Sequence, residues 1–327
     1  MRISTRMGYN TLANNIGRLQ EQNYFDSLRE ATGKDIQCIA DVPTRLMDSK
    51  KLIAQKNMKE NYMFHNDYTI SEMRYGEDIA RAIADDMQKI RELSINSTTV
   101  SIDGTVNTLA VYIKGLVNDM IRNANSDFNG KYLFGGTMTT PNSITNANPG
   151  MNNMPFELIE DPDTGRFEIV FKGNNDVRTV NKDSHSNEVI NVTANQLFGA
   201  DGIDYFSPII EIYNIIQYKP GTDEVRDVYD YLTREEIQQI ADLQVIVAKN
   251  IESIDRETAI FASRRDRIET INLQMTEEVV RLKEVIGLKE DVDILQLLKR
   301  LAQEENALQY SLNAAAKVHQ YSLFKYI

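Results

Sequence analysis

The 327-residue sequence has little of the material from which most catalytic and metal-binding sites are built. It contains one cysteine, Cys38, and three histidines, His65, His185 and His319, and it has no tryptophan. A single cysteine excludes an intrachain disulfide and a multi-cysteine metal site. Because the histidines fall on segments far apart in the sequence, we expect no imidazole cluster for acid–base chemistry or metal binding. We predict no catalytic site, no metal site and no cofactor.

Basic residues are also in deficit. The chain has 36 Lys and Arg against 48 Asp and Glu, a formal net charge of -12. Nucleic-acid binding depends largely on Lys and Arg that neutralise phosphates, so we expect no nucleic-acid partner. Arg264, Arg265 and Arg267 form a local basic group, but Asp266 and Glu269 lie among them, which favours an ion-paired helix face.

Long apolar runs are missing as well. No stretch approaches the roughly 18 consecutive apolar residues of a membrane-spanning helix, so we expect no membrane partner. The amino terminus lacks the apolar core and small-residue cleavage site of a secretory signal peptide. Any export should therefore proceed without a cleaved signal.

The amino-terminal segment predicts a helix with a narrow apolar stripe, because its apolar residues recur at steps of three and four. Gly33 favours a helix end near residue 32, since glycine most readily adopts the left-handed conformation found there. The stripe is formed by Tyr9, Leu12, Ile16 and Leu19 and continues through Phe25, Leu28 and Ala31.

The carboxyl-terminal segment repeats this pattern. Narrow stripes are typical of coiled coils, so we predict that the two ends of the chain pair with each other and with copies of themselves. This self-association stripe consists of Leu298, Leu301, Leu308, Leu312 and Ala315.

The segments between the ends also contain helical patterns. Asp41 and Pro43 predict a helix that begins near Pro43. A second, longer helix follows it and breaks near Asp103 and Gly104, and a returning helix comes next. Helical sequence resumes near Pro208 and leads into a heptad stripe typical of one long helix in a bundle. The stripe is Ile240, Val247, Ile254, Phe261, Ile268, Met275 and Leu282.

The middle of the chain has a different character. Proline, glycine and asparagine cluster from Phe128 onward. Apolar residues alternate at 156–158 and 167–171, on either side of the turn-rich segment 161–165, which predicts a β-hairpin. The region to about Phe206 should be mostly strand and loop.

These elements predict a mainly α fold with a β-rich insertion: paired terminal helices in a coiled coil, an elongated helical bundle, and an outer β-rich domain. The expected division places the terminal helices, an inner tube domain, at 1–40 and 291–327. The helical bundle occupies 41–136 and 208–290, and the β-rich outer domain occupies 137–207.

Several segments resemble the flagellin family of bacterial flagella, in the form found in hook-filament junction proteins. The most specific is 128–136, with Phe128, Asn129, Gly130, Tyr132, Phe134 and Gly135. The segments 1–5, 31–34, 264–269, 291–293 and 322–327 are also similar to the family. Asp35 departs from it where an arginine is common, Val42 replaces a usual aspartate, and the segment 139–156 is longer than usual.

The resemblance implies a structural subunit of the flagellum, exported through the flagellar type III channel to the extracellular filament base. The implied partners are copies of the chain in a ring, the first hook-associated protein, filament flagellin and a cytosolic export chaperone. The resemblance places the terminal helices in an inner tube. The main alternative is filament flagellin itself; an enzyme in the β-rich middle and an unrelated coiled-coil adaptor are further alternatives.

Overall fold

The computed structural model describes most of the chain, and its contacts define two units. Unit 1 combines both ends of the sequence, Met1–Glu60 and Thr276–Ile327, and unit 2 is the intervening segment Asn61–Met275. The described residues are 2–35, 42–99, 105–144, 153–162, 164–227 and 230–323.

Two long helices supply residues to both units. They are α2 (Pro43–Thr99) and α6 (Arg234–Glu290), each 57 residues long. The prediction of two successive helices between Pro43 and Asp103 is wrong, because no proline interrupts the segment after Pro43 and the helix continues to Thr99. The predicted break at Asp103 and Gly104, and the loop with Cys38 and Asp41, lie outside the described residues.

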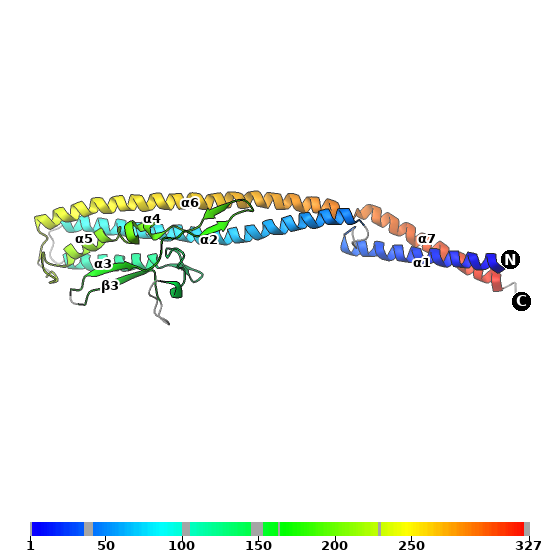
Figure 1. Ribbon diagram of the computed structural model, residues 1–327, viewed down its shortest axis with the longest axis horizontal. Coiled ribbons are helices and arrows are strands. Elements are labelled where there is room, and N and C mark those ends of the chain that lie inside the picture. Colours follow the sequence, from blue (N-terminus) through cyan, green and yellow to red (C-terminus); the bar gives the residue numbers. More distant parts are fainter. Residues whose placement is uncertain are drawn as a thin grey trace. The chain divides into compact units, whose positions relative to one another are not determined.

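In unit 2, α2 and α6 lie side by side in opposite directions (Figure 1). Ser94 of α2 accepts a hydrogen bond from Gln244 of α6 at 3.0 Å, and Asp67 accepts one from Asn272 at 2.6 Å. The two helices approach closely at Gly76, where an added Cβ would lie 3.3 Å from a ring carbon of Phe261. A small residue at position 76 therefore permits the contact.

Five positions of the predicted heptad stripe, from Ile240 to Ile268, belong to the core of unit 2. The stripe forms a buried face of α6, which confirms that this helix is packed along most of its length. Apolar residues of α2, of α3 (Thr105–Ala124) and of α5 (Ser207–Gln217) belong to the same cluster. Within the stripe, Ile240, Val247, Ile254 and Ile268 are fully buried, Phe261 and Met275 are nearly so, and Leu282 is half-buried.

The strands of unit 2 form three small antiparallel pairs. β3 (Phe156–Glu160) pairs with β4 (Phe167–Phe171), which confirms the predicted hairpin. The remaining pairs are β1 (Asp127–Phe128) with β2 (Lys131–Tyr132) and β5 (Thr179–Asn181) with β6 (Asn187–Val189). Short helices complete the region: Pro141–Ser143, α4 (Ala194–Phe198) and Ala200–Gly202.

In unit 1, α1 (Arg2–Thr32) packs against α7 (Ile294–Leu323) (Figure 1). The end of α1 at residue 32 is as predicted. The predicted continuation of its apolar stripe is wrong at two positions, since Phe25 is 40% exposed and Ala31 is exposed. Half-buried Asn23 and buried Asp26 occupy the packed face instead. In this part of the pair, the contact between α1 and α7 is therefore polar.

The fold class is mainly α with a strand-containing insertion, as predicted. The contacts within the chain divide it near residues 60 and 276, and the division into an inner tube, a helical bundle and an outer domain stays a prediction. The insertion between residues 137 and 207 lies within unit 2. Its apolar side chains Phe156, Ile169 and Phe198 belong to the same buried cluster as those of α2 and α6.

Candidate assembly site

The predicted stripe on α1 lies on the side of the helix that packs against α7. Leu12, Ile16 and Leu19 are half-buried there, in a part of the pair where the neighbouring positions are exposed. Tyr9 belongs to α1, but its side chain lies outside what the structure describes. The α1 stripe therefore serves the contact within the chain.

The predicted stripe on α7 is divided between two faces. Leu301 is buried, and Leu308 and Ala315 are half-buried on the packed side. Leu298 and Leu312 are 45% and 49% exposed, so the structure does not bring them into the contact with α1. Their role in binding other copies stays a prediction. Leu297, which the sequence reasoning missed, is fully buried instead.

A polar layer interrupts the α1–α7 contact. Asp26 is 3% exposed and accepts a hydrogen bond from Arg29 at 2.6 Å, while Arg300 of α7 lies 3.7 Å from its other oxygen. These residues line a groove of about 240 Å³ together with Gln22, Phe25 and Glu304. An ion pair in a helix contact fixes which residues face each other, because any shift would leave a buried charge unpaired.

Glu304 is the residue of this layer whose hydrogen-bonding capacity is not fully used. Its Oε2 atom is buried and has no hydrogen-bond partner. Burial raises the pKa of the Glu304 carboxyl, and the negative charge of Asp26 raises it further, although Arg300 and Arg29 oppose the shift. The charged form of Glu304 is therefore disfavoured at this position, because the two arginines offset burial and the charge of Asp26 only in part.

The residues just after α1 and just before α7 form a joint, which polar contacts hold together. Gly33 ends α1 with a φ of +69°, a conformation that favours glycine. Lys34 Nζ donates to Asp291 at 2.6 Å, across an antiparallel bridge between the same two residues. Asp35, at the position where the resembled family commonly has arginine, accepts a hydrogen bond from Arg45 at 2.8 Å. The Asp35 carboxylate, which stands in place of the family's arginine, is thus paired with a cation of the same chain.

The motif at 128–136 begins with the β1–β2 hairpin. Asn129 and Gly130 both have positive φ, 52° and 75°, as a two-residue type I′ turn requires. The Phe128 ring lies 5.5 Å from that of Tyr68 and 6.0 Å from that of Tyr75, both on α2. The hairpin is therefore attached to the long helix through aromatic packing.

In the second half of the motif, Gly135 and Gly136 lie where a larger side chain would not fit. An added Cβ at Gly135 would lie 2.5 Å from the Met138 carbonyl oxygen, and one at Gly136 would lie 2.1 Å from Asn174 Oδ1. The same Asn174 oxygen accepts a hydrogen bond from the Thr137 backbone at 2.8 Å. Together with buried Phe134, these contacts give the motif a structural role in the chain; a role in assembly stays a prediction.

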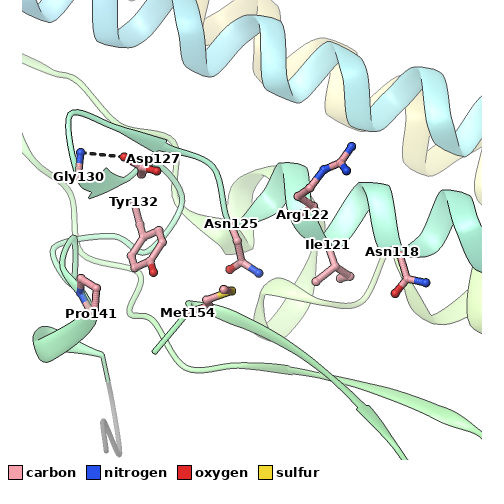
Figure 2. Close-up of a pocket in the computed structure, with 9 residues that line it drawn as sticks. All are labelled: Asn118, Ile121, Arg122, Asn125, Asp127, Gly130, Tyr132, Pro141 and Met154. Carbon is pink, nitrogen blue, oxygen red and sulfur yellow. Dashed lines mark hydrogen bonds between the residues drawn. The ribbon is translucent and has the colours of Figure 1, made fainter. Parts of the chain in front are cut away.

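A groove of about 520 Å³ lies beside this hairpin (Figure 2). Its polar groups already hold the fold: Asn125 exchanges hydrogen bonds of 2.7 and 2.8 Å with the backbone of Phe156, and Tyr132 donates to the Asn153 carbonyl at 2.9 Å. The lining contains no histidine and no cysteine. It consists of Asn118, Ile121, Arg122, Asn125, Asp127, Gly130, Tyr132, Pro141 and Met154.

Among the described residues, no set of three or more His, Cys, Asp and Glu side chains is placed to hold a metal ion. In that same part of the chain, no helix has the length and apolar character needed to cross a bilayer. His65 is exposed on α2, and His185 contacts Ser184 in the turn between β5 and β6.

Comparison with known proteins finds the fold but no relative by sequence. No family model and no curated protein matches the chain. A protein of Vibrio parahaemolyticus assigned as a flagellar hook-associated protein has a similar structure, with a TM-score of 0.61 and 13% identity, over 76% of this chain and 99% of its own.

Two further solved structures agree with it. The flagellar hook-associated protein 3 of Legionella pneumophila has a TM-score of 0.55 and 12% identity, over 74% of this chain and 98% of its own. FlgL of Xanthomonas campestris has a TM-score of 0.53 and 12% identity, over 73% of this chain and 99% of its own. The chain therefore has the fold of the flagellar hook-associated proteins.

Proposed function

We propose that this protein is a structural subunit of the bacterial flagellum and forms the junction layer between the hook-associated ring and the filament. The observation that carries the proposal is the shared fold, with the two ends of the chain paired as α1 and α7. The resemblance of segment 128–136 to hook-filament junction proteins supports the same conclusion. Nothing in this role requires catalysis.

The proposed location is extracellular, at the base of the filament, after export through the flagellar type III channel. The proposed partners are copies of the chain in a ring, the first hook-associated protein on one side and filament flagellin on the other. In this arrangement the α1–α7 pair belongs to the inner tube, the α2–α6 bundle lies outside it, and the insertion at 137–207 lies outermost.

A deletion strain tests the role directly. Without this protein, hooks should persist while flagellin is shed into the medium, and the unaltered chain should restore filaments, as seen by electron microscopy. Filaments in the deletion strain would contradict the proposal. Polymerisation on filament seeds separates the alternative: a filament flagellin would form long filaments, whereas a junction subunit should stop after a short layer.

The exposed leucines of α7 offer a sharper test of assembly. Leu312→Asp should leave the chain folded, because this side chain is 49% exposed, yet abolish filament attachment, because a charge would enter an interface between subunits. Asn313→Asp adds the same charge at the adjacent exposed position and should retain attachment. Leu308→Asp should also disturb the α1–α7 contact, which circular dichroism can detect.

We further propose that an export chaperone covers Leu301, Leu308 and Leu312 of α7 before secretion. Isolated helices with a narrow apolar stripe depend on packing partners for stability. A chain that ends at Glu290 lacks α7 and should not retain the chaperone in a pull-down. Undiminished binding of this shortened chain would reject the chaperone site.

A further inference from the structure

Charge is distributed unevenly along the α1–α7 pair. In the half that contains the chain ends, residues 2–20 carry three arginines and no acid, and residues 306–323 carry Lys317 and no acid. In the half next to the joint, residues 21–35 and 289–305 carry nine acidic residues against five basic ones. The antiparallel pairing brings like charge together: the basic ends of both helices share one half of the pair, and the acidic segments share the other.

Local helix stability does not explain this distribution. The first turn of α1 has no acidic residue, although acidic residues are the favourable ones at that end of a helix. The two described cations of the basic half, Arg18 and Lys317, are exposed and form no ion pair with any described residue. Arg18 and Lys317 are therefore available to a partner outside the chain.

The acidic half presents the complementary groups. Glu21, Glu30 and Glu305 are exposed and form no ion pair within the described part of the chain. Glu304 lies in the groove between the helices, and its Oε2 atom has no hydrogen-bond partner. Burial and the neighbouring Asp26 raise the pKa of Glu304; a cation supplied from outside would remove that penalty.

We propose that the α1–α7 pair binds a second copy of this chain in a staggered arrangement, in which the basic half of one pair lies against the acidic half of the next. The contact includes the groove at Glu304, where a lysine or arginine of the neighbour meets the unpartnered carboxylate. A second copy satisfies both halves at once, because each copy carries one surface of each sign. This inference rests on the proposed function in a polymeric layer, and it adds the direction and the charges of the contact between copies.

Charge reversal in the full-length chain tests the arrangement. One variant combines Arg18→Glu with Lys317→Glu in the basic half, and the other combines Glu21→Lys with Glu305→Lys in the acidic half. Sedimentation velocity at low ionic strength should show that each variant self-associates about tenfold more weakly than the unaltered chain. An equimolar mixture of the two should recover most of the loss, because the reversed halves complement each other between copies.

The controls separate this contact from a folding defect. Arg18→Lys with Lys317→Arg keeps the charges and should associate as the unaltered chain does, and circular dichroism should show the same helix content in all variants. Added salt should weaken association of the unaltered chain, since exposed charges are screened. Glu304→Gln should reduce that salt dependence.

Three results would overturn the inference: no self-association of the unaltered chain at millimolar concentration and low salt, equal association of reversed and unaltered chains, or a loss that the mixture does not recover. The deletion strain keeps the two proposals apart. If reversed variants restore filaments as well as the unaltered chain does, the staggered contact is rejected and the junction role stands. If the unaltered chain associates as described but restores no filaments, only the junction role is rejected.

Discussion

The two units stabilise themselves in different ways. Unit 2 contains the whole of the main hydrophobic cluster, from Ile70 to Ile268. In unit 1, the buried apolar side chains among the described residues are Val279, Ile286, Leu297 and Leu301, and α1 contributes none of them. Unit 2 therefore has a core of its own, whereas the terminal helices keep leucines exposed and a carboxylate unpaired.

The largest expected difference between the units comes from truncating a buried side chain in unit 2. Phe156 is 1% exposed, and its ring lies 4.9 Å from that of Phe171 and 5.5 Å from that of Phe198. Phe156→Ala should lower the free energy of unfolding by about 3–5 kcal/mol, because it leaves a cavity in a packed cluster. Leu298→Ala on α7 should cost less than about 1 kcal/mol. Urea unfolding followed by circular dichroism measures both, and equal losses would contradict the comparison.

Within unit 2, a buried ion pair should contribute more stability than an exposed one. Arg226 is 3% exposed, forms an ion pair with Glu236 at the start of α6, and donates to the Ile215 carbonyl at the end of α5 at 3.1 Å. Arg226→Ala should cost roughly 3 kcal/mol in urea unfolding, since it leaves Glu236 buried without its cation. Arg122→Ala removes an exposed pair and should cost under about 0.5 kcal/mol. A loss as small as that of the control would mean that water replaces the arginine.

The sequence was informative where apolar residues alone define a packed face. The heptad stripe of α6 predicted its buried side because every position of the stripe is apolar, and the β3–β4 hairpin followed from alternation around a turn. On α7 the same reasoning, based on leucines, selected Leu298 and Leu312. The packed face passes instead through Leu297 and half-buried Glu304.

An ion-paired face at Arg265 and Arg267 was predicted and is present, but the partners of most polar groups could not be predicted. Asp26 lies on the packed face of α1 because Arg29 and Arg300 neutralise it, and no apolar pattern reports such a pairing. The β5–β6 hairpin was likewise not specified, since Val180 is the apolar residue of β5 and ion pairs hold the hairpin to α2 and α6. Contacts of this kind join residues far apart in sequence, so a local pattern does not contain them.

Acid should weaken unit 2 through Glu188 of β6. Hydrogen bonds from Arg267 and Lys182 lower the pKa of Glu188 to about 2, so this carboxylate contributes stability above its unfolded pKa near 4.5 that is lost as the pH falls toward 2. Glu188→Gln should cost roughly 1–2 kcal/mol at pH 7, after allowance for solvent screening of exposed Arg267, and nearly nothing near pH 2. Glu168→Gln, at an exposed position of β4, is the matched control for urea unfolding across this range. A constant difference between Glu188→Gln and the unaltered chain would exclude this ion pair as the cause.

The smallest expected effect has the opposite sign and lies in unit 1. Because burial and Asp26 raise the pKa of Glu304 above its ordinary value of 4.5, its charged form opposes the α1–α7 contact above the folded pKa, and the penalty is lost as the pH falls from the folded pKa to the unfolded one. Glu304→Gln should therefore stabilise the helix pair at pH 7 by roughly 0.5–1 kcal/mol, seen as slower hydrogen exchange of α7 amides. Gln303→Glu, next to it at an exposed position, should give no stabilisation. If Glu304→Gln also weakens self-association, the same carboxylate that strains the free chain is the one that a neighbouring copy satisfies; faster exchange in this variant would show that the charge supports the pair instead.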